Sequence, residues 1–223
     1  MALHAKVTGA YSVGSSEWND NVNALWNFSS GLGYSEEAFS GMMGNCQHEG
    51  GMNPWRWQGD QVNMSNGYGL FQYTPASGYI NTYGPLSNRY APNTQIPGPS
   101  SGAAPEDGLA QIEVIDVSGK YVSNTIRRNL LINYVPDCDN YTTLSAFKTV
   151  TDISKATYLW VGFFECPGWW LSQTNVSSNM QPRLDDAQNA YNLIHTPVPP
   201  TPTGSLLIWG GGRENIRLNI LRR

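Results

Sequence analysis

Apolar residues recur at helical spacing in several separate stretches of the chain, and polar or glycine-rich segments divide these stretches. A helix is expected over residues 17–29, where Trp18, Val22 and Leu25 share one face before glycines end the pattern. Similar spacing predicts further helices over residues 74–84, 105–117, 151–165 and 182–194. Residues 84–107 contain several prolines and little periodicity, so we expect a long surface loop there. The pattern as a whole predicts a mostly α-helical fold.

The most informative predicted helix follows Ser35, a good N-cap residue, and ends at Gly50. Its apolar side is one stripe, which consists of Ala38, Phe39, Met42, Met43 and Cys46. With successive side chains turned by about 100°, Glu49 falls within the arc of this stripe and His48 falls outside it. Burial and the negative end of the helix dipole would both raise the pKa of such a carboxyl group, as a general acid requires. The alternative is a carboxylate at a frayed helix end that turns into solvent.

The chain is poor in charge and rich in aromatic residues. Asp, Glu, Lys and Arg make up 13% of its 223 residues, about half the usual share, whereas it has 8 Trp, 12 Tyr and 6 Phe. The net charge of −4 argues against a nucleic-acid-binding protein. No apolar stretch approaches ~18 residues, so we expect no membrane span. The first residues lack the apolar core of a secretory signal, so we expect no export by the usual route.

The end of the chain differs from the rest. We expect one domain over residues 1–195, a proline-rich linker over residues 196–204, and a separate tail over residues 205–223. The tail has four Arg and one Glu, or +3, whereas nine basic and sixteen acidic residues give residues 1–195 a charge of −7. An apolar and basic tail suits docking onto a partner subunit; it could equally be the start of a further element or a disordered end.

Three segments of the chain together resemble a known family. They are residues 43–54 (Met-Gly-Asn-Cys-Gln-His-Glu-Gly-Gly-Met-Asn-Pro), residues 67–72 (Gly-Tyr-Gly-Leu-Phe-Gln) and residues 163–168 (Phe-Phe-Glu-Cys-Pro-Gly), the last followed by Arg183 in a closing helix. In this order and at these distances they resemble the lysozyme-like domain of tail-associated muralytic proteins of bacteriophages, within the lysozyme and lytic transglycosylase superfamily. The resemblance covers roughly residues 18–195.

The resemblance implies a compact, mostly helical lysozyme-like fold (α+β) with a small loop or hairpin region after the catalytic helix. It implies cleavage of the β-1,4 bond between N-acetylmuramic acid and N-acetylglucosamine in bacterial peptidoglycan, with Glu49 as the acid that protonates the bridging oxygen. It also implies a phage protein that acts at the bacterial cell wall, either from the virion tail or after release from the host cytoplasm. Residues 205–223 would then contact phage tail proteins. We expect neither a metal ion nor a cofactor.

The loop after Glu49 carries the other candidate site residues. Asp60 would be a second catalytic carboxylate, which activates water or stabilises positive charge on the sugar, but an Asp that caps a turn is an equal alternative. The candidate sugar-binding residues are Trp55, Trp57, Tyr68, Gln72 and Tyr73. Ordinary loop packing is the alternative for the aromatic residues, and a structural hydrogen bond is the alternative for Gln72. Without a second carboxylate in the cleft, a lytic transglycosylase, in which the muramyl 6-hydroxyl attacks, becomes the better interpretation.

Glu165 is more typical of a structural carboxylate that binds Arg183 or caps the turn that follows it. Cys46 is expected to be a small buried hydrophobic residue. A Cys138–Cys166 disulfide is possible, but an odd number of cysteines and the lack of a secretory signal argue against it.

Three other classes of protein are alternatives to a glycosidase. A zinc peptidase would need a second His after the His48-Glu49 pair, which the chain lacks. A cysteine peptidase would pair Cys46 with His195, yet Cys46 belongs to the apolar stripe. A non-catalytic peptidoglycan-binding or structural virion module stays open, and the carboxyl group of Glu49 argues against it.

Overall fold

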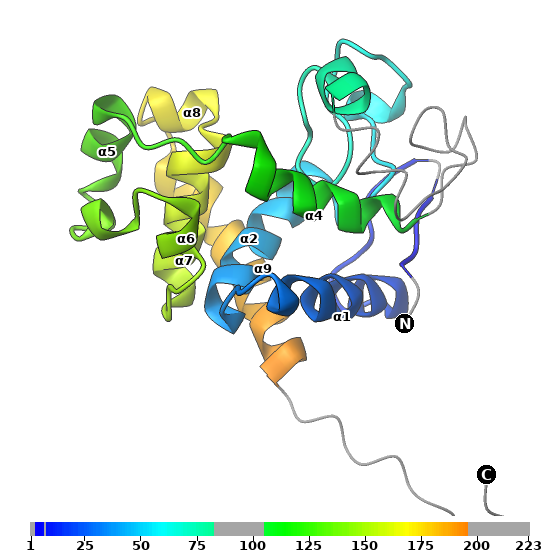
Figure 1. Ribbon diagram of the computed structural model, residues 1–223, viewed down its shortest axis with the longest axis horizontal. Helices are drawn as coiled ribbons and strands as arrows, with labels where there is room; N and C mark the ends of the chain where they lie inside the picture. Colours follow the sequence, from blue (N-terminus) through cyan, green and yellow to red (C-terminus); the bar gives the residue numbers. More distant parts are fainter. Residues whose placement is uncertain (1–2, 7, 83–104, 196–223) are drawn as a thin grey trace, which may run out of the picture.

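The computed structural model describes residues 3–6, 8–82 and 105–195, and nearly all regular structure in these residues is helical, as the sequence predicts (Figure 1). The helices and helical turns are α1 (Ser16–Gly31), α2 (Glu36–Glu49), η1 (Gln58–Asp60), α4 (Asp107–Ser118), α5 (Thr125–Leu131), η3 (Cys138–Tyr141), α6 (Leu144–Phe147), α7 (Ile153–Trp160), η4 (Val161–Glu165), α8 (Gly168–Leu171) and α9 (Val176–His195). Residues 76–82 are also helical. Most of the expected surface loop, the linker of residues 196–204 and the tail of residues 205–223 lie outside the described residues.

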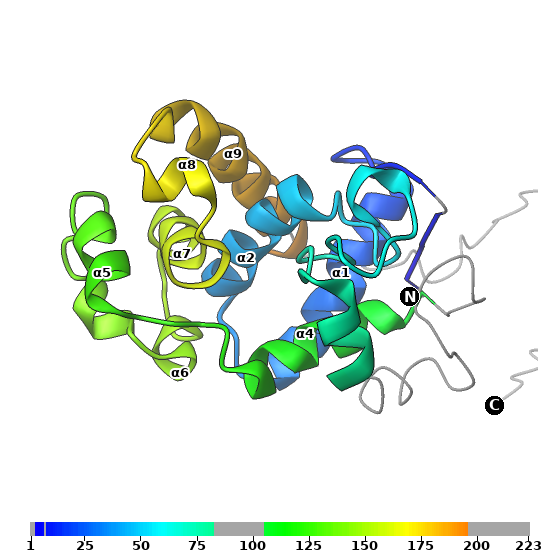
Figure 2. The same ribbon diagram turned by 90° about the horizontal axis from the view of Figure 1, so that it is seen from above.

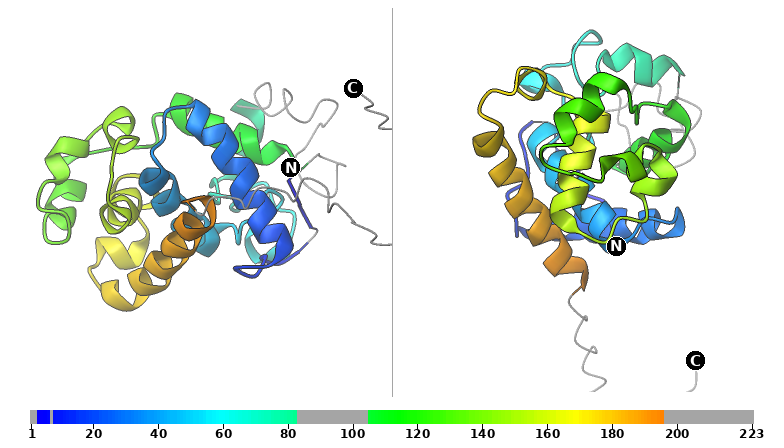
Figure 3. Two further views of the ribbon diagram at one scale, coloured as in Figure 1. Left: turned by 90° about the horizontal axis from the view of Figure 1, so that it is seen from below. Right: turned by 90° about the vertical axis from the view of Figure 1, so that its left-hand side faces the viewer.

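Helix α2 lies at the centre of the domain. It makes its most extensive contacts with α9 and α7, and it also contacts α1. In Figure 2, α7, α8 and α9 lie on one side of α2, whereas α1, α4 and the loop that follows α2 lie on the other. Figure 3 shows α9 running beside α1 and α2. The central position means that the residues on α2 are surrounded by elements from both halves of the chain.

The start and the buried face of α2 are those that the sequence predicts. The Ser35 hydroxyl accepts a hydrogen bond of 3.0 Å from the backbone N–H of Ala38, which caps the helix. Every residue of the predicted apolar stripe is buried, with at most 1% of its surface exposed; these residues are Ala38, Phe39, Met42, Met43 and Cys46. Burial of this stripe is the main reason why the segment is helical here, because a helix of this length is only marginally stable alone.

Two glycines let neighbouring helices approach α2 very closely. A Cβ atom added to Gly44 would lie 2.3 Å from the carbonyl oxygen of Arg183 and 2.8 Å from the Cβ of Ala187, both on α9. A Cβ atom added to Gly41 would lie 2.6 Å from the Cβ of Ala156 on α7. Helix α2 therefore contacts the backbones of both neighbours, which no larger residue at these positions allows.

Two predicted helices differ in detail from the observed ones. The last helix begins at Val176, six residues before the expected start at Pro182, because burial of Val176 and Met180 extends it past the proline. The helix expected to reach Glu165 ends as α7 at Trp160 and widens into the π-helical turn η4. These changes matter because η4 and α9 both carry residues that reach the functional site.

The expected loop or hairpin region after α2 contains paired backbone but, within the described residues, no extended strand. Isolated antiparallel bridges join Trp57 to Tyr68 and Tyr68 to Tyr73. The three cysteines are unpaired, and Cys46 is fully buried, as predicted. No helix in the described ranges is both long enough and apolar enough to cross a bilayer.

We expect Gly44→Ala to destabilise the domain by roughly 1–3 kcal/mol, because the added methyl group must push α9 away from α2. Gly31→Ala is the matched control, since an added Cβ at the end of α1 has nothing within 4 Å. The control should be neutral or stabilising by up to about 1 kcal/mol. Urea unfolding of the three proteins measures the difference, and equal stability of both variants would contradict close α2–α9 packing.

Candidate active site

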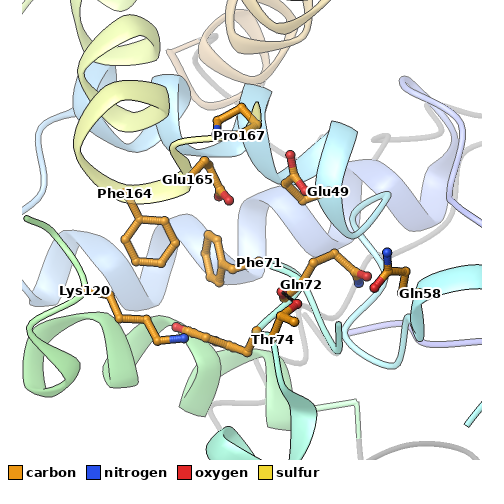
Figure 4. Close-up of a pocket in the computed structure, with 10 residues that line it drawn as sticks. Glu49, Gln58, Phe71, Gln72, Thr74, Lys120, Phe164, Glu165 and Pro167 are labelled. Atoms are coloured by element: carbon orange, nitrogen blue, oxygen red, sulfur yellow. Dashed lines mark hydrogen bonds between the residues drawn. The ribbon is translucent and has the colours of Figure 1, made fainter. Parts of the chain in front are cut away.

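A pocket of about 450 Å³ opens at the C-terminal end of α2 (Figure 4). The residues that line it come from α2, the loop after α2, the segment after α4 and the η4 turn; they are Glu49, Gln58, Phe71, Gln72, Tyr73, Thr74, Lys120, Phe164, Glu165 and Pro167. In Figure 4 Glu49 and Glu165 come from different elements at one side of the pocket, and Lys120 lies at the opposite side. The pocket thus combines two carboxyl groups, one amine, aromatic walls and several amide or hydroxyl groups.

The end of α2 and the following loop are in direct backbone contact. A Cβ atom added to Gly50 would lie 2.5 Å from the carbonyl oxygen of Gly69 and 2.6 Å from the Cα of Leu70. Only a residue without a side chain allows this approach. The contact brings Phe71 and Gln72, which follow Leu70, to the pocket that Glu49 lines.

Helix α4 fixes the same loop from its other side. Tyr68 and Tyr73 exchange backbone hydrogen bonds of 3.2 and 2.9 Å, which closes a tight turn. The buried amide of Gln111 accepts a hydrogen bond of 2.7 Å from the backbone N–H of Leu70 and donates one of 2.9 Å to the carbonyl of Pro54. One side chain therefore ties together two parts of the loop that are distant in sequence.

Glu49 is held by an ion pair with Arg183 on α9. The Nη2 of Arg183 lies 2.8 Å from the Oε1 of Glu49, and the two side chains are 8% and 24% exposed. Asn45, one turn before Glu49, accepts a hydrogen bond of 3.1 Å from the Nε of Arg183 and donates one to the carbonyl of Thr157. The carbonyl of Asn179 accepts from Nη1. The guanidinium is thereby fixed on three sides, and Glu49 remains partly open to the pocket.

Of the two structural roles expected for Glu165, the ion pair with Arg183 is wrong, because Arg183 pairs with Glu49. Glu165 instead accepts a hydrogen bond of 3.1 Å from the indole N–H of Trp160. Burial raises the pKa of Glu165 well above its ordinary value, and the negative charge of Glu49 raises it further. The Trp160 hydrogen bond and the positive charges of Arg183 and Lys120 act in the opposite direction. Glu165 therefore keeps its proton at pH values where an exposed Glu is ionised.

Asp60 lies outside the residues that line the pocket. Its Oδ1 accepts a hydrogen bond of 2.8 Å from the backbone N–H of Gly9 and lies 3.1 Å from the Nε of Arg56. These contacts fasten the N-terminal segment to the loop. The structure does not bring Asp60 together with Glu49 in the pocket, which favours the structural alternative for Asp60.

Two of the predicted sugar-binding aromatic residues are in the core of the loop, and the prediction that they stack on a sugar is corrected. Trp57 and Tyr68 are 1% and 0% exposed, with ring centroids 4.7 Å apart. The hydroxyl of Tyr68 donates to Oδ2 of Asp107 on α4. A loop without much regular structure needs apolar side chains to bury, and these rings supply them. Trp55 is partly buried and is not among the residues that line the pocket.

Gln72 and Tyr73 do line the pocket, and their binding to a sugar stays a prediction. The side-chain amide of Gln72 also donates to the carbonyls of Gly69, at 2.9 Å, and Arg56, at 3.2 Å, so the structural alternative for Gln72 holds as well. Tyr73 is 2% exposed, and the Nζ of Lys120 lies 4.5 Å from the centre of its ring.

Several lining residues have no signal in the sequence that could identify them. Lys120 follows α4 in an irregular segment more than 70 residues after Glu49 and belongs to none of the three motif segments. Phe164 is different, since it lies inside residues 163–168 and directly precedes Glu165. The motif marks that segment, but not which of its side chains reach the pocket.

The arrangement does not support a cysteine peptidase. Cys46 is fully buried, and burial and nearby carboxylates raise the pKa of its thiol well above the ordinary value. His195 pairs with Glu36 at the other end of α2, with Nδ1 and Oε2 2.8 Å apart. Among the residues that the structure describes, no cluster of three or more His, Cys, Asp or Glu side chains could hold a metal ion.

Comparison with known proteins shows what the chain is similar to. The sequence pattern of the family described as phage tail lysozyme matches residues 20–194. "Morphogenesis protein 1" of Bacillus phage B103 is 41% identical over 66 residues, which are 29% of this chain and 18% of that protein. The match thus spans under a fifth of the length of that relative.

The buried carboxyl group of Asp107 on α4 helps to hold the loop in place. It accepts hydrogen bonds from Tyr68, Tyr79 and Gln111, and burial raises its pKa from 3.8 to about 6. A pKa that is higher in the folded chain means a stabilising contribution that is complete below about pH 3.8 and lost as the pH rises through about 6.

Relative to Asp107→Asn, which cannot titrate, the native chain should lose on the order of 2–3 kcal/mol of unfolding free energy between about pH 4 and pH 7. Urea unfolding of both proteins at a series of pH values measures this difference. A difference that does not change with pH would show that Asp107 is not a buried titrating group.

Proposed function

Because the chain belongs to the phage tail lysozyme family, we propose that it is an N-acetylmuramidase, a glycoside hydrolase that cleaves the β-1,4 bond between N-acetylmuramic acid and N-acetylglucosamine. The observation that carries this proposal is the position of Glu49. Its carboxyl group lies at the edge of an open pocket, held by a buried Arg, and a second carboxyl group faces the same pocket. Most glycosidases have a pair of carboxyl groups in a cleft that is large enough for a sugar.

In the proposed reaction, Glu49 protonates the bridging oxygen while the bond from that oxygen to the anomeric carbon breaks. Positive charge develops on the muramyl ring, and water then attacks the anomeric carbon. The aromatic walls of the pocket, Phe71 and Phe164, offer flat surfaces against which sugar rings can pack. Gln58, Gln72 and Thr74 offer amide and hydroxyl groups that can bond to sugar hydroxyls. In this proposal they take the place of the buried Trp57 and Tyr68.

We further propose that the protein acts on the bacterial cell wall as part of a phage tail and helps the phage to penetrate it, or acts as a phage lysin. The family description supports a tail-associated role, and the name of the Bacillus phage B103 relative is consistent with a part in particle assembly. Docking onto tail proteins through residues 205–223 remains a proposal of the same kind, since that segment lies outside the described residues.

A lytic transglycosylase with the same bond specificity is the second candidate. The position of Asp60 favours it, because the carboxylate that was expected to activate water is engaged with Gly9 and Arg56 outside the pocket. Transglycosylases need one acid–base group and form a 1,6-anhydro product without water. The two candidates therefore differ in product and not in the role of Glu49.

Digestion of purified peptidoglycan, followed by mass analysis of the products, tests the proposed function. We expect fragments with reducing N-acetylmuramic acid ends from the native protein, and a loss of rate of about a hundredfold or more with Glu49→Gln. Glu37→Gln, at the opposite end of the same helix, is the matched control and should keep full activity.

The possible results separate the alternatives. Products with 1,6-anhydro ends would identify a transglycosylase. Binding to peptidoglycan without any released product would identify a non-catalytic module and refute the enzyme. Full activity of Glu49→Gln would refute only the assignment of the acid.

The contacts of Asp60 lead to a separate expectation. Asp60→Asn should keep peptidoglycan cleavage within about a few-fold of the native rate, since the residue touches Gly9 and Arg56 and not the pocket. It should lower the thermal midpoint slightly, because it removes one exposed ion pair. A loss of several orders of magnitude in kcat at an unchanged midpoint would instead make Asp60 the second catalytic carboxylate.

A further inference from the structure

We propose that Lys120 is a specificity-determining residue of the pocket and that its ammonium group binds a carboxylate carried by the N-acetylmuramic acid unit of the substrate. This inference rests on the proposed function, because it concerns which sugar the same pocket accepts. The carboxylate belongs either to the lactyl group of a glycan without peptide or to the attached stem peptide. Both sources offer the same chemistry, an anion that a glycan of N-acetylglucosamine alone does not carry.

The backbone on both sides of Lys120 is fixed. Helix α4 ends at Gly119, which has a left-handed conformation with φ of 62°. Tyr121 is 8% exposed, and its hydroxyl donates a hydrogen bond of 3.0 Å to a backbone carbonyl. The N–H of Val122 donates one of 2.8 Å to the carbonyl of Phe163 in the η4 turn. Lys120 therefore starts from a defined position beside η4, and its side chain lines the pocket.

Lys120 has no anionic partner among the residues that the structure describes. Its Nζ lies 4.5 Å from the centre of the Tyr73 ring and forms neither a hydrogen bond nor an ion pair in that part of the chain. The other Lys and Arg side chains there all bind a carboxylate or a backbone carbonyl; they are Lys6, Arg56, Arg127, Arg128, Lys148, Lys155 and Arg183. An aromatic face attracts a cation but accepts no conventional hydrogen bond, so the ammonium of Lys120 keeps its donors for a ligand.

Glu165 does not take the place of such a partner. Its carboxyl group and the ammonium of Lys120 attract each other electrostatically, but they form no ion pair within 4.0 Å. Glu165 accepts a hydrogen bond from the indole of Trp160 instead. In Figure 4 the rings of Phe71 and Phe164 lie between Glu165 and Lys120. The ammonium is therefore separated from the acidic side of the pocket by a surface against which a sugar ring can pack.

This position suits an anion on the sugar whose bond would break. In the proposed reaction the anomeric carbon of N-acetylmuramic acid lies at Glu49, and the ring packs against the aromatic walls. The lactyl ether leaves the same ring at another carbon and extends beyond it, ending in a carboxylate or in the amide bond to the stem peptide. The ammonium of Lys120 is a compact charge on a flexible stem, so it can follow a carboxylate on either group. N-acetylglucosamine has the same ring and N-acetyl group but no anion, so Lys120 would distinguish the two sugars.

Glycan strands that differ only in charge test this role. Strands without peptide and strands that keep the stem peptide are each prepared in a charged form and in a neutral form, in which the carboxylates are converted to methylamides. The native protein should cleave a charged form with a kcat/KM about three- to tenfold higher than the neutral form, as expected for an ion pair at an accessible site. The kind of strand that shows this preference identifies which carboxylate Lys120 binds.

Variants of Lys120 connect the preference to the residue. Lys120→Gln should abolish it by raising KM for the charged strands at nearly unchanged kcat, since the contact is the same before and during bond cleavage. Lys120→Glu should reverse the preference and Lys120→Arg should keep it. A side chain with only a structural role would instead lower the rates on charged and neutral strands by the same factor. Lys155→Gln removes the same charge from a lysine outside the pocket and is the matched control, which should keep the native preference.

The results separate this inference from the proposed function. Equal kcat/KM for charged and neutral strands in the native protein would overturn the inference and leave the function standing, and so would a preference that Lys120→Gln keeps. If the native protein binds the strands without cleaving them, the proposed function fails, and the ratio of the Kd values for charged and neutral strands, measured by calorimetry, decides on Lys120 by the same criteria. A native protein that neither binds nor cleaves any strand would refute both.

Discussion

The ion pair between Arg183 and Glu49 depends on how closely α9 packs against α2. The two helices approach until the backbone of Arg183 occupies the space where a side chain on residue 44 would lie. At that separation the guanidinium can reach Asn45 and Glu49 at once. Two further pairs cross the same interface, His48 with Asp186 and Glu36 with His195, so polar contacts follow the length of α2. These outer pairs are more exposed and contribute little stability, whereas the buried Arg183 orients the carboxyl group that faces the pocket.

The scarcity of charge and abundance of aromatic residues has a structural explanation in the loop after α2. This loop lacks extended strands within the described residues, and its stability comes from rings that pack on one another: Tyr73 and Tyr79 stack with centroids 5.1 Å apart, and Trp57 packs on Tyr68. Asp107 and Gln111 of α4 supply the polar partners that these buried groups need. Phe71 and Gln72 can then stand in fixed positions at the pocket, because the rings beneath them form a small core.

The sequence predicts well what depends on neighbouring residues and predicts poorly what depends on distant ones. The cap at Ser35, the buried stripe of α2 and the placement of Glu49 on its apolar side follow from helical periodicity, and the structure has all three. Periodicity identifies a buried face but not the element that covers it, so the partner of Arg183 could not be deduced from spacing. The same limit explains Trp57 and Tyr68: a flat ring on a loop suits a sugar or a core equally, and only the position of α4 decides between them.

Residues 49 and 183 are separated by 134 positions, so most of the domain lies between the carboxyl group and the guanidinium that orients it. During synthesis, α2 and the loop after it leave the ribosome long before α9 does. A nascent or truncated chain that ends before residue 183 has Glu49 but not its partner, and it also lacks the helix that covers one side of α2. The order of synthesis therefore leaves Glu49 without its guanidinium partner until α9 is made, although every residue that lines the pocket precedes α9.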